Sequence, residues 1–221
     1  MSGKKLFTWM AIGLAAWVSS LPVQAGGGEK FRVTVTNLTR TQTFTPILVA
    51  SHRGGVSLFT PGEPASDALA ALAEGGDTVP LTGVLEGDTR VVDVNASGDL
   101  LGPGESVTVK VSARRGAKFI SLAAMLIPTN DGFISLNGVR APQGNETLTV
   151  RSPAYDAGSE PNDELCINIP GPVCGGAGGS PGVGGEGYVH IHGGIHGIGG
   201  LDPSLYDWRN PVAEITIRRV H

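Results

Sequence analysis

The chain has 221 residues, of which 16% are charged and 5% aromatic, with 34 glycines and 15 prolines. The formal net charge is −4, and no basic stripe is present to meet a phosphate backbone, which argues against a nucleic-acid partner. Residues 1–25 have the form of a secretory signal peptide: Lys4 and Lys5 precede an apolar run at 6–18, and a small-x-small cleavage sequence closes it at 23–25.

The apolar run is shorter than the roughly 20 residues that a membrane span needs, so an anchor is the weaker alternative. No later segment is long and apolar enough to span a bilayer. We therefore predict an exported protein, periplasmic or secreted, whose residues 26–221 form one domain. In an oxidising compartment, Cys166 and Cys174 favour a disulfide worth about 2.5 kcal/mol, although two free thiols or a metal-binding pair are alternatives.

Apolar and polar residues alternate along much of the chain, which indicates half-buried β-strands. The run at 118–127 is instead continuously apolar, as expected of a strand buried on both faces. One helix is predicted at 64–75, where Ser66 is a capping residue and Gly75 ends the element. Many short strands and one inserted helix predict an all-β sandwich. The strands are expected, in chain order, at residues 31–36, 46–50, 89–94, 106–112, 118–127, 133–136, 146–151 and 212–220.

A Gly- and Pro-rich stretch without periodicity runs from 152 to 188, and a compact domain rarely keeps such a loop without a function or a tie. Carboxylates at its start, Asp156 and Glu160, can join Asp131 from the turn at 129–133 around a calcium ion, which prefers hard oxygen ligands. Ordinary turn acids are the alternative. Three neighbouring residues are either further ligands or solvated loop: Asn162, Asp163 and Glu164.

A second constellation is the sequence Y-V-H-I-H-G-G-I-H at 188–196. His190 and His192 are two residues apart, so on a strand they point the same way. Together with His196 they can hold zinc or copper, which would make the protein a metal-binding protein or metalloenzyme. The alternative is that the three histidines pack against the loop and bond backbone groups.

The chain contains T-N-D-G-F at 129–133, preceded by the run at 122–128, and Y-D-A-G-S-E at 155–160. These are the most specific of several segments that resemble the spondin domain, which is named for the matrix protein F-spondin and is also found in mindin. Segments at 59–62 and 206–211 look like the single-domain branch found in secreted bacterial proteins. The resemblance covers nearly all of residues 30–221.

This resemblance implies a C2-like antiparallel β-sandwich with calcium bound at one end. The family's three acidic ligands fall on Asp131, Asp156 and Glu160. Animal members have Asp at the last position, and a Trp where this chain has Gly132 and Phe133. The relatives act in adhesion, so we expect a non-enzymatic binding module for an extracellular ligand, either a carbohydrate or a cell-surface protein. No nucleophile with its base and no cofactor-binding motif in its required context argues for catalysis.

Overall fold

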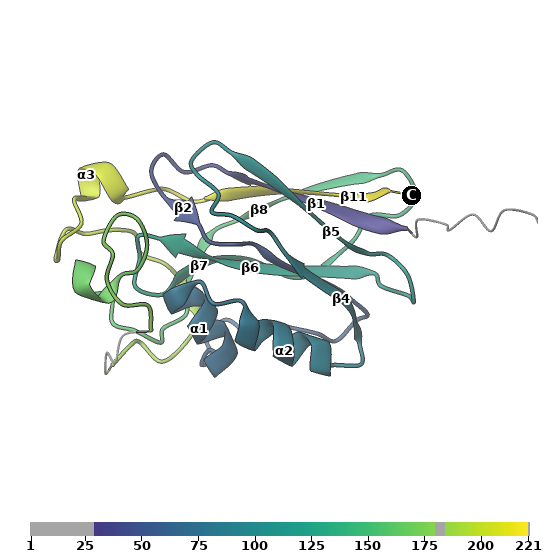
Figure 1. The fold of residues 1–221 in the computed structure, drawn as a ribbon, viewed down its shortest axis with the longest axis horizontal. Coiled ribbons are helices and arrows are strands. Elements are labelled where there is room, and N and C mark those ends of the chain that lie inside the picture. Colours follow the sequence, from purple (N-terminus) through teal and green to yellow (C-terminus); the bar gives the residue numbers. More distant parts are fainter. Residues whose placement is uncertain (1–28, 180–183, 221) are drawn as a thin grey trace, which may run out of the picture.

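Two antiparallel sheets form the body of the protein, seen as stacked layers in Figure 1. The computed structural model describes residues 29–179 and 184–220. The expected signal peptide at 1–25 lies outside the described residues. The first sheet has the order β5-β1-β11-β8. Its strands are β1 (Lys30–Asn37), β5 (Ser106–Ser112), β8 (Thr147–Ser152) and β11 (Ala213–Val220).

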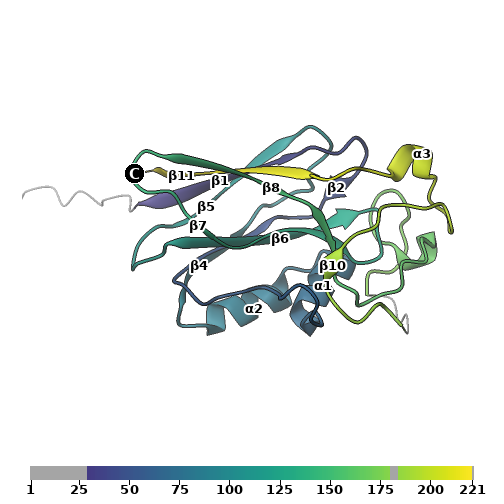
Figure 2. The ribbon, with the colours of Figure 1, turned by 180° about the vertical axis from the view of Figure 1, so that it is seen from behind.

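The second sheet has the order β10-β9-β7-β6-β3-β4, with β2 paired to β6. In this sheet β9 pairs with β7 on one side and with β10 on the other. Figure 2 shows the sandwich from behind, with β10 toward the end that carries α3. Its strands are β2 (Thr43–Phe44), β3 (Leu48–His52), β4 (Val91–Ala96), β6 (Phe119–Ile127), β7 (Gly132–Arg140), β9 (Ala154–Asp156) and β10 (His190–Ile191).

The core between the sheets follows the alternation of the first and last strands. Val33 pairs with Ile217 on β11 and with Val109 on β5, and all three side chains point inward. They pack against Ile120 and Leu122 of β6. Because successive side chains alternate between the two faces of a strand, one face of each strand lies in the core, which confirms the predicted sandwich.

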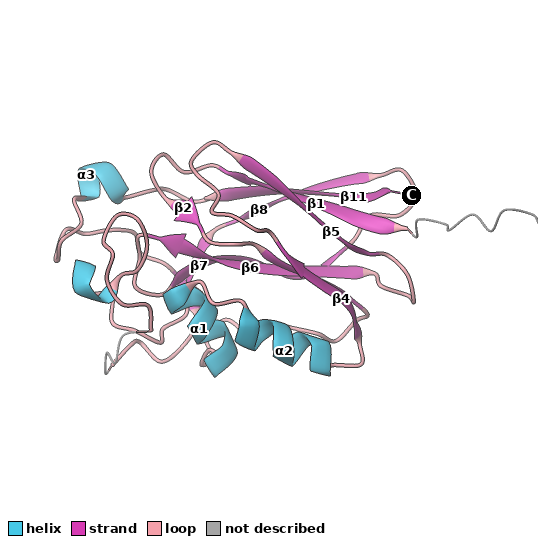
Figure 3. Ribbon diagram, viewed as in Figure 1, coloured by secondary structure: helices cyan, strands magenta, loops and turns pink. Residues whose placement is uncertain are grey.

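Two helices cover the outer face of the second sheet: α1 (Asp67–Gly75) and α2 (Val79–Gly87) (Figures 1 and 3). Leu69 and Leu72 of α1 pack in one cluster with Ala123 of β6. Because the other sheet covers its opposite face, β6 is buried from its second residue onward, as its continuous apolar sequence predicts. Each fully buried leucine contributes about 1.5–3 kcal/mol.

The helix predicted at 64–75 is present. The Ser66 hydroxyl accepts the Leu69 N–H at 3.3 Å, and Gly76 closes the helix with φ +68°. The expectation of a single inserted helix was wrong, because α2 follows at once. Its sequence V-P-L-T-G-V-L-E-G has low helix propensity, but its proline falls in the first turn and Leu81 and Leu85 bury one face.

Irregular segments gather at one end of the sandwich, opposite the C-terminus, and we call this the loop end (Figure 1). They include η1 (Cys166–Asn168) and α3 (Pro203–Tyr206). Cys166 and Cys174 form the predicted disulfide, which excludes the free-thiol and metal-pair alternatives. Among the described residues, no helix is both long and apolar enough to cross a membrane.

Candidate metal centre

Three adjacent strands converge on Asp156. This residue ends β9, where it pairs with Gly132 of β7 on one side and with His190 of β10 on the other. Asp131 directly precedes β7, and its carbonyl accepts the Ala157 N–H at 3.2 Å. Strand pairing therefore brings two of the three predicted calcium ligands together from separate turns.

The Asp131 carboxylate is fully buried. Its Oδ2 accepts the backbone N–H groups of Ser159 at 2.7 Å and of Glu160 at 3.0 Å, and also the Ser159 hydroxyl at 3.2 Å. Its Oδ1 is buried and has no hydrogen-bond partner. Burial, and next the nearby charge of Asp156, raise the pKa of Asp131 to about 7. Keeping the Asp131 carboxylate ionised without a neighbouring cation therefore costs folding free energy.

Asp156 is also fully buried. Its Oδ1 accepts the Gly158 N–H at 2.8 Å, and its Oδ2 accepts the Asn162 amide at 2.7 Å. Within the described part of the chain, its ion-pair neighbours are histidines and not Lys or Arg. Glu160 is buried at 1% exposure and borders the cluster through its backbone N–H to Asp131. The three-acid calcium site stays a prediction.

Two of the three sequence-predicted histidines approach Asp156. His190 Nε2 lies 3.6 Å from Asp156 Oδ1, and His192 Nε2 lies 3.9 Å from Asp156 Oδ2. His196 is elsewhere: its ring is 63% exposed and lies 3.8 Å from Glu164. The structure therefore gathers two of the histidines at the predicted calcium ligand and separates off the third.

The two rings near Asp156 differ electrostatically. Burial lowers the pKa of His192, and the charge of Asp156 opposes this only in part. Burial also acts to lower the pKa of His190, but a hydrogen bond to the Ile191 carbonyl and the charges of Asp156 and Glu186 outweigh it, so this pKa is raised.

Glu186 completes a compact group with Asp156 and His190, in which one ligand atom from each residue lies within 4.8 Å of the others. Asn162 bridges the two acids, because its amide nitrogen lies 2.7 Å from Asp156 Oδ2 and 3.1 Å from Glu186 Oε1. Sequence reasoning missed Glu186, which stands alone between glycines. Its only signal was a position four residues before His190.

Glu164 proves to be a loop anchor. Its buried carboxylate accepts the backbone N–H groups of His196, Gly197 and Ile198 at 2.5, 2.7 and 3.0 Å. Its backbone φ of +55° is unusual for a residue with a side chain. The prediction of solvated loop at Glu164 was wrong, since the residue is 3% exposed, and its two oxygens tie the glycine-rich segment 193–200 to the start of the disulfide loop.

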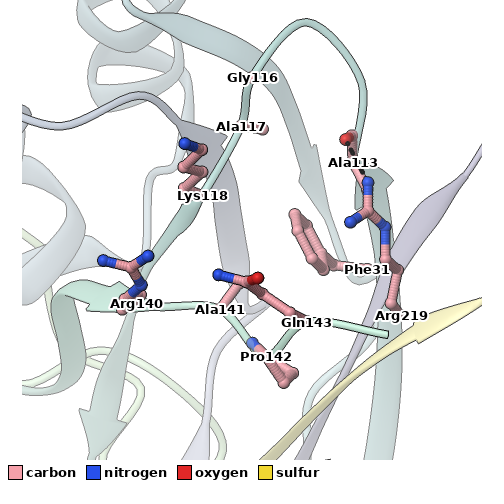
Figure 4. A pocket seen from close by; sticks show the side chains of 10 residues that line it. All are labelled: Phe31, Ala113, Gly116, Ala117, Lys118, Arg140, Ala141, Pro142, Gln143 and Arg219. Carbon is pink, nitrogen blue, oxygen red and sulfur yellow. Dashed lines mark hydrogen bonds between the residues drawn. The ribbon is translucent and has the colours of Figure 1, made fainter. Parts of the chain in front are cut away.

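Cavities occur at both ends of the sandwich. One of about 280 Å³ adjoins the metal centre and is lined by His192, His196, Trp208 and Arg209 among others. Another of about 220 Å³ lies at the far end of β6 and β7, where Phe31 lies between Gln143 and Arg219 (Figure 4). Only the first is placed to serve a ligand that contacts the metal centre.

The fold and site define an antiparallel β-sandwich with a buried cluster of acids and histidines in its loop end. The family model Spondin_N matches residues 35–160. The match spans more than half of the chain, and the protein belongs to this family of spondin N-terminal domains. It includes Asp131 and Asp156 and ends at Glu160, whereas Glu186, His190 and His192 lie beyond it. No curated protein matches the chain.

Proposed function

We propose that this protein is an exported, non-enzymatic binding module whose loop end is shaped by calcium bound to Asp131, Asp156 and Glu160. The observation that carries the proposal is the pair of fully buried aspartates, Asp131 just before β7 and Asp156 at the end of the paired β9, with Asp131 Oδ1 lacking any hydrogen-bond partner. Two carboxylates so placed repel each other, and a divalent cation removes that repulsion while supplying the missing partner.

The donor chemistry fits calcium. Carboxylate oxygens are hard ligands, and carbonyl groups and water complete the six to eight positions that calcium prefers. When bound, calcium would hold the turn at 129–133 to the segment 156–160, which begins the long loop. The protein's own residues then position that loop, since Asp131 already bonds the backbone of Ser159 and Glu160.

An exported binding role is supported by the family, by the disulfide between Cys166 and Cys174, and by the signal-like sequence at 1–25. The ligand we propose is extracellular, a carbohydrate or a cell-surface protein. The cavity lined by His192, Trp208 and Arg209 adjoins the metal centre and offers polar and aromatic contacts to either. The non-enzymatic role rests on the lack of a recognisable catalytic motif in the sequence.

The test is thermal unfolding of the mature protein in chelator and in calcium. Calcium at 100 times its Kd stabilises a one-site protein by about 2.7 kcal/mol. Asp156→Ala should abolish this stabilisation, whereas Asp99→Ala, an exposed acid between β4 and β5, should keep it. A calcium response of normal size in Asp156→Ala would refute the assignment.

A further inference from the structure

We infer that His190, Asp156 and Glu186 bind a zinc-type divalent cation at a second site, which shares only Asp156 with the proposed three-acid calcium site. His190 stands directly opposite Asp156 in the pairing of β10 with β9, so both side chains leave the sheet on the same face. Nε2 of His190 lies 3.6 Å from Asp156 Oδ1 and 3.9 Å from Glu186 Oε2. Two ligand bonds of about 2.0–2.2 Å meeting at one cation span such gaps.

The His190 ring carries its lone pair at the correct nitrogen. Its Nδ1 lies 2.9 Å from the Ile191 carbonyl, which can only accept, so Nδ1 holds the proton. In the neutral ring Nε2 is then unprotonated, and it is buried without a hydrogen-bond partner. A backbone carbonyl that fixes the tautomer in this way is the usual support of a metal-binding histidine.

Asn162 orients the two carboxylates. Its amide donates to Asp156 Oδ2 at 2.7 Å and to Glu186 Oε1 at 3.1 Å. The other oxygen of each acid, Asp156 Oδ1 and Glu186 Oε2, is the one that faces His190 Nε2. Asp156 Oδ1 also accepts the Gly158 N–H, which leaves it a second lone pair for a cation. The three ligand atoms are therefore positioned by bonds outside the group.

His192 supports this site without being a ligand. Its Nδ1 accepts the Gly194 N–H at 3.0 Å, so in the neutral ring the proton lies on Nε2. That Nε2 has no hydrogen-bond partner, its side chain is only 3% exposed, and it faces Asp156 Oδ2 at 3.9 Å. His192 thus adds an N–H directed at the shared carboxylate. The structure separates the roles of two histidines that the H-x-H spacing treats alike.

The ligand set selects the ion. One imidazole nitrogen with two carboxylates suits zinc and its neighbours in the first transition row, whereas calcium prefers oxygen ligands alone. The Asp156 side chain closes the base of the site, while the side chains of His190 and Glu186 are 27% and 35% exposed. A cation can therefore enter from solvent and keep a water ligand. Both exposed ligands lie outside the segment matched by the family model.

The experiment is metal titration of the mature protein, free of any histidine tag, with Zn²⁺ or Co²⁺ alone and in excess calcium. One Zn²⁺ should bind per chain, and Co²⁺ should give the visible absorption of a site with low coordination number. His190→Gln and Glu186→Gln should each weaken Zn²⁺ binding by at least about 100-fold, and Asn162→Ala by about 10–100-fold. His196→Gln, from the same segment, should leave the affinity unchanged because that ring lies by Glu164.

Wild-type affinity in both His190→Gln and Glu186→Gln would overturn the inference, and so would equal weakening in His196→Gln. Glu186→Gln keeps the test valid if His190→Gln does not fold, because this residue is exposed. A ligand that the two sites do not share separates this test from the calcium proposal: Asp131→Asn removes a predicted calcium ligand and should retain Zn²⁺ binding. Zinc binding without a calcium response would refute only the calcium site.

Discussion

Asp131→Asn should stabilise the metal-free protein, although it removes a residue that we propose as a calcium ligand. The asparagine keeps an oxygen to accept the Ser159 and Glu160 N–H groups. Its amide nitrogen takes the place of Oδ1, which is buried and has no partner, and faces the charge of Asp156. The substitution therefore removes a buried charge and retains the local hydrogen bonds.

The magnitude follows from the raised pKa. In the folded protein the pKa of Asp131 is about 7, against 3.8 for the ordinary carboxyl group. The difference is about three units at 1.4 kcal/mol each, and relaxation around the charge reduces it, so we expect about 2–4 kcal/mol at pH 8. The pKa of Asp131 is higher in the folded than in the unfolded protein. The free-energy cost of its charge is therefore absent below about pH 4, grows between about pH 4 and 7, and reaches its full value above about pH 7.

The assay is urea unfolding in chelator from pH 4.5 to 8. Wild type should lose stability relative to Asp131→Asn as the pH rises, and the difference should fall to about 1 kcal/mol or less at pH 4.5. Calcium should offset most or all of this difference, since at 100 times Kd it stabilises wild type by about 2.7 kcal/mol and the variant much less. An Asp131→Asn protein that is less stable than wild type in chelator at pH 8 would refute the reasoning.

Three further substitutions test the framework around the site. Glu164→Ala should cost about 2–4 kcal/mol in urea unfolding, since three backbone N–H groups lose a buried carboxylate, and hydrogen exchange at 196–198 should accelerate. Gly158→Ala should lower the melting temperature more than Gly104→Ala. Both glycines have positive φ, but a Cβ at 158 would lie 2.3 Å from the Tyr188 carbonyl oxygen, whereas a Cβ at 104 would meet nothing within 4 Å. Leu72→Ala, at a fully buried position of α1, should cost about 2–5 kcal/mol, against less than about 1 kcal/mol for Val84→Ala at an exposed position of α2.

Eight strands were predictable because their signal is local, whereas the short β2, β9 and β10 were not predicted. A residue such as Val33 or Ile215 is read as inward-facing from its immediate neighbours, and its burial confirms this. The helix α2 was missed for the opposite reason. Its intrinsic propensity is poor, and it forms because Leu81 and Leu85 reach an apolar sheet face that no local pattern reveals.

The sequence by itself determined the sandwich, the disulfide, the family and the presence of acids at the turns. Only the tertiary structure decided which groups meet. The pairing of β9 with both β7 and β10 sets His190 against Asp156, and the loop fold brings Glu186 and Asn162 to the same carboxylate. A metal site depends on distances of a few ångströms between residues remote in sequence. Those distances are fixed by strand register and loop anchoring, which residue spacing alone does not encode.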